Sequence, residues 1–212
     1  MAEQAAIDPT AVDMRTKREQ ILDAAYTVFS QKGYHRATVD EIIALADTGK
    51  GTVYNYFHNK EQLFYTLVTE RSRPFEEAAK KIVESARDPL EKIKILIRLY
   101  LEFYVKNADL WRVFMHEMRG FSSSVSLSEK QCDKYRECFK ATISLLEKVL
   151  EEGIEKKAFR TCQADRTAYC LFSVILTMVF QKFAADGPDS LEQSACMIAD
   201  TFFYGIVNRE TN

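Results

Sequence analysis

Residues 33–60 read GYHRATVDEIIALADTGKGTVYNYFHNK and predict two short helices joined by a tight turn. The first helix has a clear start signal, because Thr38 and Glu41 stand three residues apart and can cap each other's backbone N–H groups. After the turn at 47–49, only Val53 and Phe57 are suited to the core, four residues apart on one helical face. The rest of the second helix is polar or aromatic, so it is available to a partner.

This pattern is typical of a DNA-binding helix-turn-helix, in which the second helix enters the major groove. Asn55 is the best candidate for hydrogen bonds to a base edge. Lys50 and Thr52 stand at the helix N-terminus, where they can reach bases or phosphate, and Gly51 allows close approach of the backbone. The alternative is a small three-helix domain whose polar helix is simply solvated.

The order of these elements resembles the signature of the TetR family of bacterial transcriptional regulators. The matching elements are Gly33-Tyr34, Thr38, Lys50-Gly51-Thr52-Val53-Tyr54-Asn55-Tyr56-Phe57 and Asn59-Lys60-Glu61. The resemblance implies that Thr38, Tyr54 and Tyr56 contact DNA and that Lys60, at the start of the next helix, holds a phosphate. Two positions depart from the family pattern, since Asp47 and Gly49 replace a common Gly and Ser. Asp tolerates the left-handed conformation and Gly is an acceptable N-cap, so both fit the motif.

Composition and charge limit the kinds of partner. The 212 residues are 47% hydrophobic, which is enough for a small domain followed by a larger one, and the net charge is −2. Bulk positive charge therefore cannot drive DNA binding, and a local patch must do so. The sequence predicts a mobile arm at 1–14, a helix-turn-helix domain at 15–60, and an effector-binding and dimerisation domain at 61–212.

Apolar residues recur at helical spacing beyond the motif, and strand alternation is absent, so the expected fold is all-α. A three-helix DNA-binding domain should precede a larger helical bundle. The first helix should end at Gly33, and Pro74 should kink or break the fourth, at about 59–86. Later breaks are expected at Asp88-Pro89, near Asn107, and at 120–128, 159–163 and 187–188.

Aromatic and methionine residues are dense in the second domain, where core packing is the plainest interpretation of each one. Together they can also line a cavity for an apolar or amphipathic effector, as the resemblance implies. The candidate ligand-binding residues are Tyr104, Trp111, Phe114, Met115, Met118, Tyr169 and Phe172. Arg112 and Arg119 could meet an anionic head group or be solvated.

A two-fold dimer is the geometric expectation, because one protomer presents one recognition helix and a single half-site gives little specificity. The resemblance places the interface on the last two helices, at about 165–185 and 190–208. Their apolar content exceeds the needs of one buried stripe. The candidate interface residues are Leu171, Ile175, Val179, Ile198, Phe202 and Ile206.

Other classes of protein find little support in the sequence. The five cysteines lack metal-ligand spacing, so we expect reduced thiols, no metal and no cofactor. His116 and Glu117 are neighbours that do not face one another on a helix, and catalytic motifs are absent, so we do not expect an enzyme. A signal peptide is not evident, and the apolar run at 168–180 is too short to span a bilayer. We therefore expect a soluble cytoplasmic protein.

The sequence as a whole predicts a homodimeric repressor that leaves double-stranded operator DNA when a small apolar or amphipathic effector binds. Two alternatives stay open within DNA binding, an activator and a regulator that responds to no ligand. The alternative from another class is an all-helical carrier of hydrophobic ligands without specific DNA binding. The effector, the operator sequence and the regulated genes cannot be derived from these residues.

Overall fold

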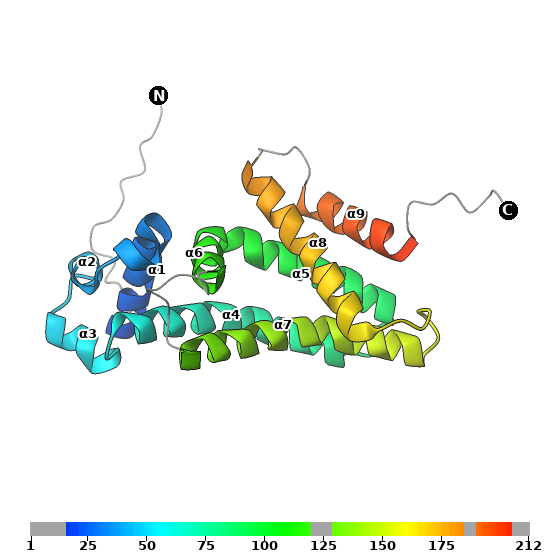
Figure 1. Ribbon diagram of the computed structural model, residues 1–212, viewed down its shortest axis with the longest axis horizontal. Helices are drawn as coiled ribbons and strands as arrows, with labels where there is room; N and C mark the ends of the chain where they lie inside the picture. The colour runs from blue at the N-terminus through cyan, green and yellow to red at the C-terminus, as the bar shows by residue number, and fades with distance from the viewer. Residues whose placement is uncertain (1–15, 120–128, 185–189, 205–212) are drawn as a thin grey trace, which may run out of the picture. The chain divides into compact units, whose positions relative to one another are not determined.

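The computed structural model describes residues 16–119, 129–184 and 190–204 (Figure 1). The predicted arm at 1–14 lies outside them. The described residues form helices and no strands, which confirms the all-α prediction, and none of these helices has the length and apolar character needed to cross a bilayer. The helices are α1 Lys17–Arg36, α2 Val39–Leu45, α3 Lys50–Tyr56, α4 Lys60–Glu84, α5 Pro89–Lys106, α6 Ala108–Arg119, α7 Glu129–Glu155, α8 Ala164–Ala184 and α9 Leu191–Tyr204.

Backbone contacts divide the chain into two compact units, Met1–Leu67 and Val68–Asn212. The division falls inside α4, so the first unit comprises α1 to α3 with the first turns of α4. The functional boundary at 60/61 stays a prediction.

Reciprocal caps begin the first two helices. Thr16 Oγ1 accepts from the Glu19 N–H at 3.3 Å while the Glu19 carboxylate accepts from the Thr16 N–H at 2.7 Å. Thr38 and Glu41 form the same arrangement before α2, as the sequence predicts. The first helix breaks at Gly33, as the sequence predicts, and one further turn completes α1 at Arg36. Gly33 itself has φ 76° and ψ 171°, a conformation that residues with a Cβ rarely adopt.

The core of the first unit joins α1 to the start of α4. The Phe29 and Phe64 rings are fully buried and meet edge to face, with centroids 5.0 Å apart. Val53 and Phe57 are 1% and 2% exposed. This confirms that α3 contributes only these two large side chains to the core.

The second unit is built around α5, which packs against α7, α8 and α9. Tyr100, at the centre of α5, is fully buried and its hydroxyl donates to the Thr142 carbonyl of α7 at 2.6 Å. Burial raises the pKa of Tyr100 well above that of a free tyrosine. Its hydroxyl is therefore a neutral hydrogen-bond donor that fixes α5 against α7.

Most predicted helix boundaries are confirmed. Asp88 caps α5 by accepting from the Leu90 N–H at 2.9 Å, and Asn107 separates α5 from α6. The loop at 156–163 separates α7 from α8, whereas the breaks at 120–128 and 187–188 lie outside the described residues. A break at Pro74 is wrong, since α4 continues through this residue. Pro74 is exposed, so its ring does not displace a core side chain.

A buried lysine joins three helices of the second unit. Lys92 on α5 is 2% exposed, and its ammonium donates to the Val83 carbonyl of α4 at 2.8 Å and to the Glu152 carboxylate of α7 at 2.7 Å. Lys156 also contacts Glu152, at 2.7 Å. Hydrogen bonds from Lys156 and Lys92 hold the pKa of Glu152 below its ordinary value.

Candidate functional site

The turn between α2 and α3 has the geometry that the motif requires. The Thr48 N–H donates to the Ile43 carbonyl and the Asp47 N–H to the Ala44 carbonyl, both at 3.3 Å, as in a Schellman motif. Asp47 has φ 45°, the left-handed conformation that its side chain tolerates. The chain therefore reverses sharply here and directs α3 away from α2.

The exposed face of α3 carries the predicted DNA-contacting side chains. Lys50, Gly51 and Asn55 are exposed, Tyr54 and Tyr56 are 40% and 45% exposed, and Thr52 is half-buried. Neither tyrosine belongs to the buried core of this unit. The structure thus brings these residues together on one short helix, and their contacts with DNA stay a prediction.

Residues at the start of α2 are held by local bonds. Thr38 Oγ1 accepts from the Glu41 N–H at 3.3 Å, so this threonine has a structural role as a cap. Glu41 also pairs with Lys32 of α1 at 2.6 Å, and these bonds, led by the one from Lys32, lower the pKa of Glu41. Asp40 pairs with Lys50 at 3.2 Å, which restrains the first side chain of α3 in the free protein.

Lys60, the predicted phosphate ligand, occupies an unexpected position. Its ammonium donates to three backbone carbonyls at the end of α1, those of Tyr34 at 2.9 Å, His35 at 3.3 Å and Ala37 at 3.1 Å. It also lies 4.7 Å from the centroid of the Tyr34 ring. A cation at the negative end of a helical turn is favourable. Lys60 therefore ties the start of α4 to the end of α1.

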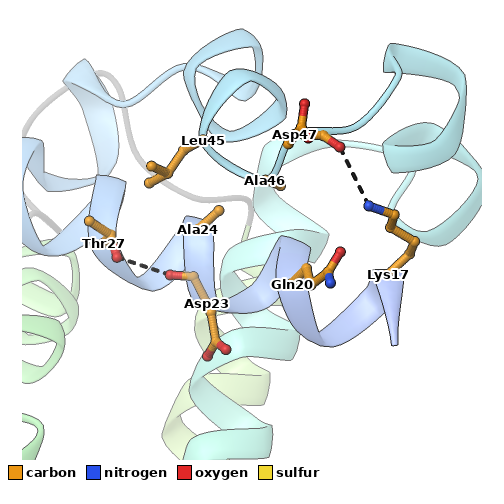
Figure 2. Close-up of a pocket in the computed structure, with 8 residues that line it drawn as sticks. All are labelled: Lys17, Gln20, Asp23, Ala24, Thr27, Leu45, Ala46 and Asp47. Atoms are coloured by element: carbon orange, nitrogen blue, oxygen red, sulfur yellow. Dashed lines mark hydrogen bonds between the residues drawn. The ribbon is translucent and has the colours of Figure 1, made fainter. Parts of the chain in front are cut away.

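A cavity of about 430 Å³ lies between α1 and the turn after α2 (Figure 2). Lys17 donates to the Asp47 carbonyl at 3.5 Å across it, and Thr27 donates to the Asp23 carbonyl at 3.1 Å. Two carboxylates, those of Asp23 and Asp47, belong to the lining. Because carboxylates repel phosphate, a lining with two carboxylates and one ammonium is poorly complementary to DNA, and the exposed face of α3 is the better candidate.

A second cavity, of about 310 Å³, lies in the second unit between α6 and the later turns of α8. Tyr104 and Trp111 line it, with ring centroids 4.8 Å apart, and Arg112 adds a cation that pairs with Asp109 at 3.4 Å. The remaining lining residues are Ala108, Asp109, Leu176, Val179 and Phe180. Aromatic and aliphatic walls with one ion pair of a guanidinium and a carboxylate suit an apolar or amphipathic ligand.

The other predicted ligand-binding residues stand in different places. Phe114 meets Trp111 at 4.8 Å and Phe172 meets Tyr104 at 5.8 Å, so both support the cavity without lining it. Tyr169 is 44% exposed and is not part of the lining. The side chains of Met115 and Met118 lie outside the described part of the structure.

Leu176 and Val179 were not predicted to contribute to this cavity. The sequence signal is weak, because α8 is apolar on nearly every side and its periodicity does not distinguish the faces. The spacing of Leu176 and Phe180, four residues apart, is the one pattern that could have paired them.

The predicted interface residues are mostly core residues of a single protomer. Leu171 and Ile175 are 0% exposed, Val179 is 5% exposed and Ile198 is 2% exposed, which leaves little surface for a partner. Phe202 is half-buried, and Ile206 lies outside the described residues. The large apolar side chains that do remain exposed on α8 and α9 are Tyr169, Val174, Phe180, Met197 and Tyr204.

Comparisons with known proteins agree with this architecture. Residues 21–66 match the model of the N-terminal domain described as bacterial regulatory proteins of the tetR family, and residues 86–206 match that of the tetracyclin repressor-like C-terminal domain. The fatty acid metabolism regulator protein of Bacillus subtilis is 30% identical over 141 residues, 66% of this chain and 70% of that protein.

Solved structures show the same fold over nearly the whole chain. A putative fatty acid metabolism regulator of Clostridium perfringens superposes with a TM-score of 0.78 and 27% identity, covering 90% of this chain and all of that one. The transcriptional regulator FadR from Bacillus subtilis, in complex with stearoyl-CoA, gives a TM-score of 0.76 and 25% identity over 89% of this chain and 99% of that one.

Family models thus cover both the motif and most of the second unit. The chain belongs to the TetR family of bacterial transcriptional regulators, which bind operator DNA as homodimers through a helix-turn-helix and respond to small-molecule effectors.

Proposed function

We propose that this regulator is a repressor released from its operator by an amphipathic fatty acyl effector, an acyl-CoA thioester being the best candidate. The observation that carries this proposal is the cavity beside Trp111, whose apolar walls suit an acyl chain. An anionic group of the effector can compete with Asp109 for the exposed Arg112 guanidinium. The relatives named as fatty acid regulators, one of them solved with stearoyl-CoA, support the same class of effector.

For the DNA-binding step, the proposed contacts are made by Lys50, Gly51, Thr52, Tyr54, Asn55 and Tyr56 on α3. The exposure of this face supports them, since a recognition helix must present its side chains to the major groove. Thr38 supports the position of α2 through its cap, and its hydroxyl is also within the proposed contact surface. Lys60 acts mainly by positioning α4 against α1.

The cavity volume limits how the effector enters. About 310 Å³ is at the lower end of the usual range for ligand pockets, roughly 300–1,000 Å³. Only part of a long acyl chain fits without movement, and Trp111 is the half-buried side chain that must shift first. Effector binding is therefore coupled to a displacement of α6.

A chain of ring contacts links this cavity to α4. Trp111 meets Tyr104 at 4.8 Å, and Phe75 of α4 stacks on Phe103 at 4.5 Å and meets Tyr100 edge to face at 4.8 Å. A shift of Trp111 presses on α5 residues that contact Phe75. Because α4 also carries Lys60 at its first position, its displacement can change the spacing of the two recognition helices in the dimer.

The test is a gel shift with the full-length dimer and the DNA that flanks its own gene. We expect specific binding that survives competitor DNA and is released by palmitoyl-CoA, while free CoA leaves the complex intact. Retention of the complex at saturating palmitoyl-CoA would remove the effector assignment. A reporter gene under the same DNA fragment separates repression from activation, since deletion of a repressor raises expression.

We further propose that the protein acts in the cytoplasm, where its operator DNA lies, and that it carries out no catalysis. Relatives named as transcriptional or metabolic regulators support this view.

A further inference from the structure

A larger cavity lies at the other end of α8, lined by residues of the loop after α7, the first turns of α8 and the last turn of α9. Figure 1 shows the first turns of α8 beside the end of α7. The cavity has a volume of about 790 Å³, and it shares no lining residue with the cavity beside Trp111. We call it the α7–α9 cleft and define it by Phe159, Arg160, Arg166, Cys170 and Phe203. Its size is within the usual range for small-molecule sites, roughly 300–1,000 Å³.

One wall of the cleft is aromatic and depends on a glycine. The Phe159 and Phe203 rings are half-buried, with centroids 5.2 Å apart. Gly153, in the last turns of α7, lies against the Phe159 ring, and a Cβ at this position would overlap that ring. The glycine therefore lets Phe159 lie against α7, which leaves the cleft open.

The charge of the cleft is positive. Arg160 and Arg166 belong to its lining, and no Asp or Glu does among the described residues. Both guanidiniums are exposed, and neither forms an ion pair within the described part of the chain. The N-terminus of α8 at Ala164 adds a partial positive charge between them in sequence. Unpaired guanidiniums beside an apolar wall are complementary to an anion with an apolar body.

We propose that the α7–α9 cleft binds an amphipathic carboxylate, separately from the effector cavity. The carboxylate is held by Arg160 and Arg166, and the apolar body lies on Phe159 and Phe203. This site goes beyond the proposed repressor function, because it needs neither the cavity beside Trp111 nor operator DNA.

Calorimetric titration of the intact dimer with dodecanoate tests the site, with the methyl ester of dodecanoate as the uncharged control. We expect the carboxylate to bind and the ester to bind at least tenfold more weakly. Arg160→Gln and Arg166→Gln should each weaken the binding of dodecanoate about tenfold, because each removes a guanidinium that pairs with the carboxylate. Both variants should fold normally, since both arginines are exposed. Gly153→Ala, which forces the Phe159 ring towards the cleft, should weaken dodecanoate binding independently of charge. Arg112→Gln in the effector cavity should leave this affinity unchanged.

Thiol labelling locates the bound carboxylate, because Cys162 and Cys170 line the cleft and exposed Cys196 does not. Dodecanoate should slow labelling of Cys162, read by mass spectrometry of peptides, while Cys196 reacts at an unchanged rate. Trp111 fluorescence should not respond when this site alone fills. Unreactive Cys162 in the ligand-free dimer, or equal binding by both arginine variants and the parent protein, would overturn the proposal. Palmitoyl-CoA should still release the arginine variants from DNA. A failure of the proposed carboxylate site is therefore distinguishable from a failure of the proposed effector cavity.

Discussion

Asn55 stands between two exposed tyrosines on α3 and has no role in the core of the first unit. Its amide can donate to and accept from one base edge. We therefore expect Asn55→Ala to reduce discrimination by roughly 1–3 kcal/mol at one base pair in each half-site. Binding titrations against operators with single base-pair changes measure this loss. Equal loss of specific and nonspecific affinity would remove Asn55 from the base-contacting set.

Lys60 gives a contrasting prediction, because its ammonium donates to three carbonyls at the end of α1. Lys60→Ala should lower the free energy of unfolding of the first unit by roughly 1–2 kcal/mol, as charge-assisted hydrogen bonds are lost. Its DNA affinity should fall with an unchanged salt dependence. Urea unfolding and DNA titrations at several salt concentrations measure the two effects.

Lys50 is the matched control for Lys60, since it is exposed and faces the proposed DNA side from α3. Lys50→Ala should change stability little and lower the slope of log affinity against log salt by about one. If Lys60→Ala gave that salt effect and left the unfolding curve unchanged, Lys60 would be a phosphate ligand, as the family resemblance implies.

At the scale of elements, the Lys92–Glu152 pair joins α4, α5 and α7. Glu152→Gln leaves the buried Lys92 ammonium without its counter-charge and should cost roughly 2–4 kcal/mol at pH 7. Glu91→Gln is the control, because Glu91 pairs with Arg87 at 3.2 Å on the exposed surface and should cost no more than about 1 kcal/mol. Urea unfolding at fixed dimer concentration compares them.

The same pair predicts a pH dependence. The pKa of Glu152 is lowered in the folded state, so its contribution to stability is complete above the ordinary value of 4.5. That contribution is lost as the pH falls through the lowered folded-state value. The parent protein should therefore lose stability more steeply below about pH 5 than Glu152→Gln does. Parallel curves for the two proteins would show that Glu152 does not titrate with folding.

Trp111 on α6 should report effector binding, because it is the single tryptophan and lines the effector cavity. We expect palmitoyl-CoA to change its fluorescence over the same concentrations that release DNA. Phe114→Ala, which removes a ring 4.8 Å from Trp111, should shift both curves together. Met118→Ala is expected to do the same. If neither substitution changed the potency of palmitoyl-CoA, the effector would bind elsewhere.

The sequence predicts the positions of helices better than their buried faces. Capping residues such as Thr38 and Asp88, and breaks such as Pro89, leave local signals, so the predicted bounds mostly agree with the structure. The buried face of α8 could not be predicted, because an all-round apolar helix has no polar side to orient it. The hydrogen bonds of Lys60 could not be predicted either, because their acceptors are backbone carbonyls, which every residue has.

At the scale of the whole molecule, we expect the dimer interface on those faces of α8 and α9 that the protomer leaves exposed. Val174 and Met197 are 42% and 47% exposed on these helices. We expect Val174→Glu or Met197→Glu to dissociate the dimer, because a desolvated charge would face an apolar partner. Sedimentation velocity measures the oligomeric state, and Ala86→Glu, at an exposed site outside these helices, is the control.

If the Ala86→Glu control were also a folded monomer, the loss of the dimer would not locate the interface, because any added charge would separate the subunits. Dimers of both Val174→Glu and Met197→Glu would instead place the interface outside the exposed faces of α8 and α9. Loss of specific DNA binding should accompany dissociation, since two half-sites are then no longer bound together.

The small share of α3 in the core has a consequence for how such proteins diversify. Val53 and Phe57 are the large side chains that anchor this helix in the core of the first unit, while most of its other residues are exposed. Substitutions at the exposed positions cost little folding free energy, since surface changes usually alter stability by less than about 0.5 kcal/mol. Duplicated copies of such a gene can therefore acquire new operators through a few exchanges on one helical turn and remain folded at every intermediate step.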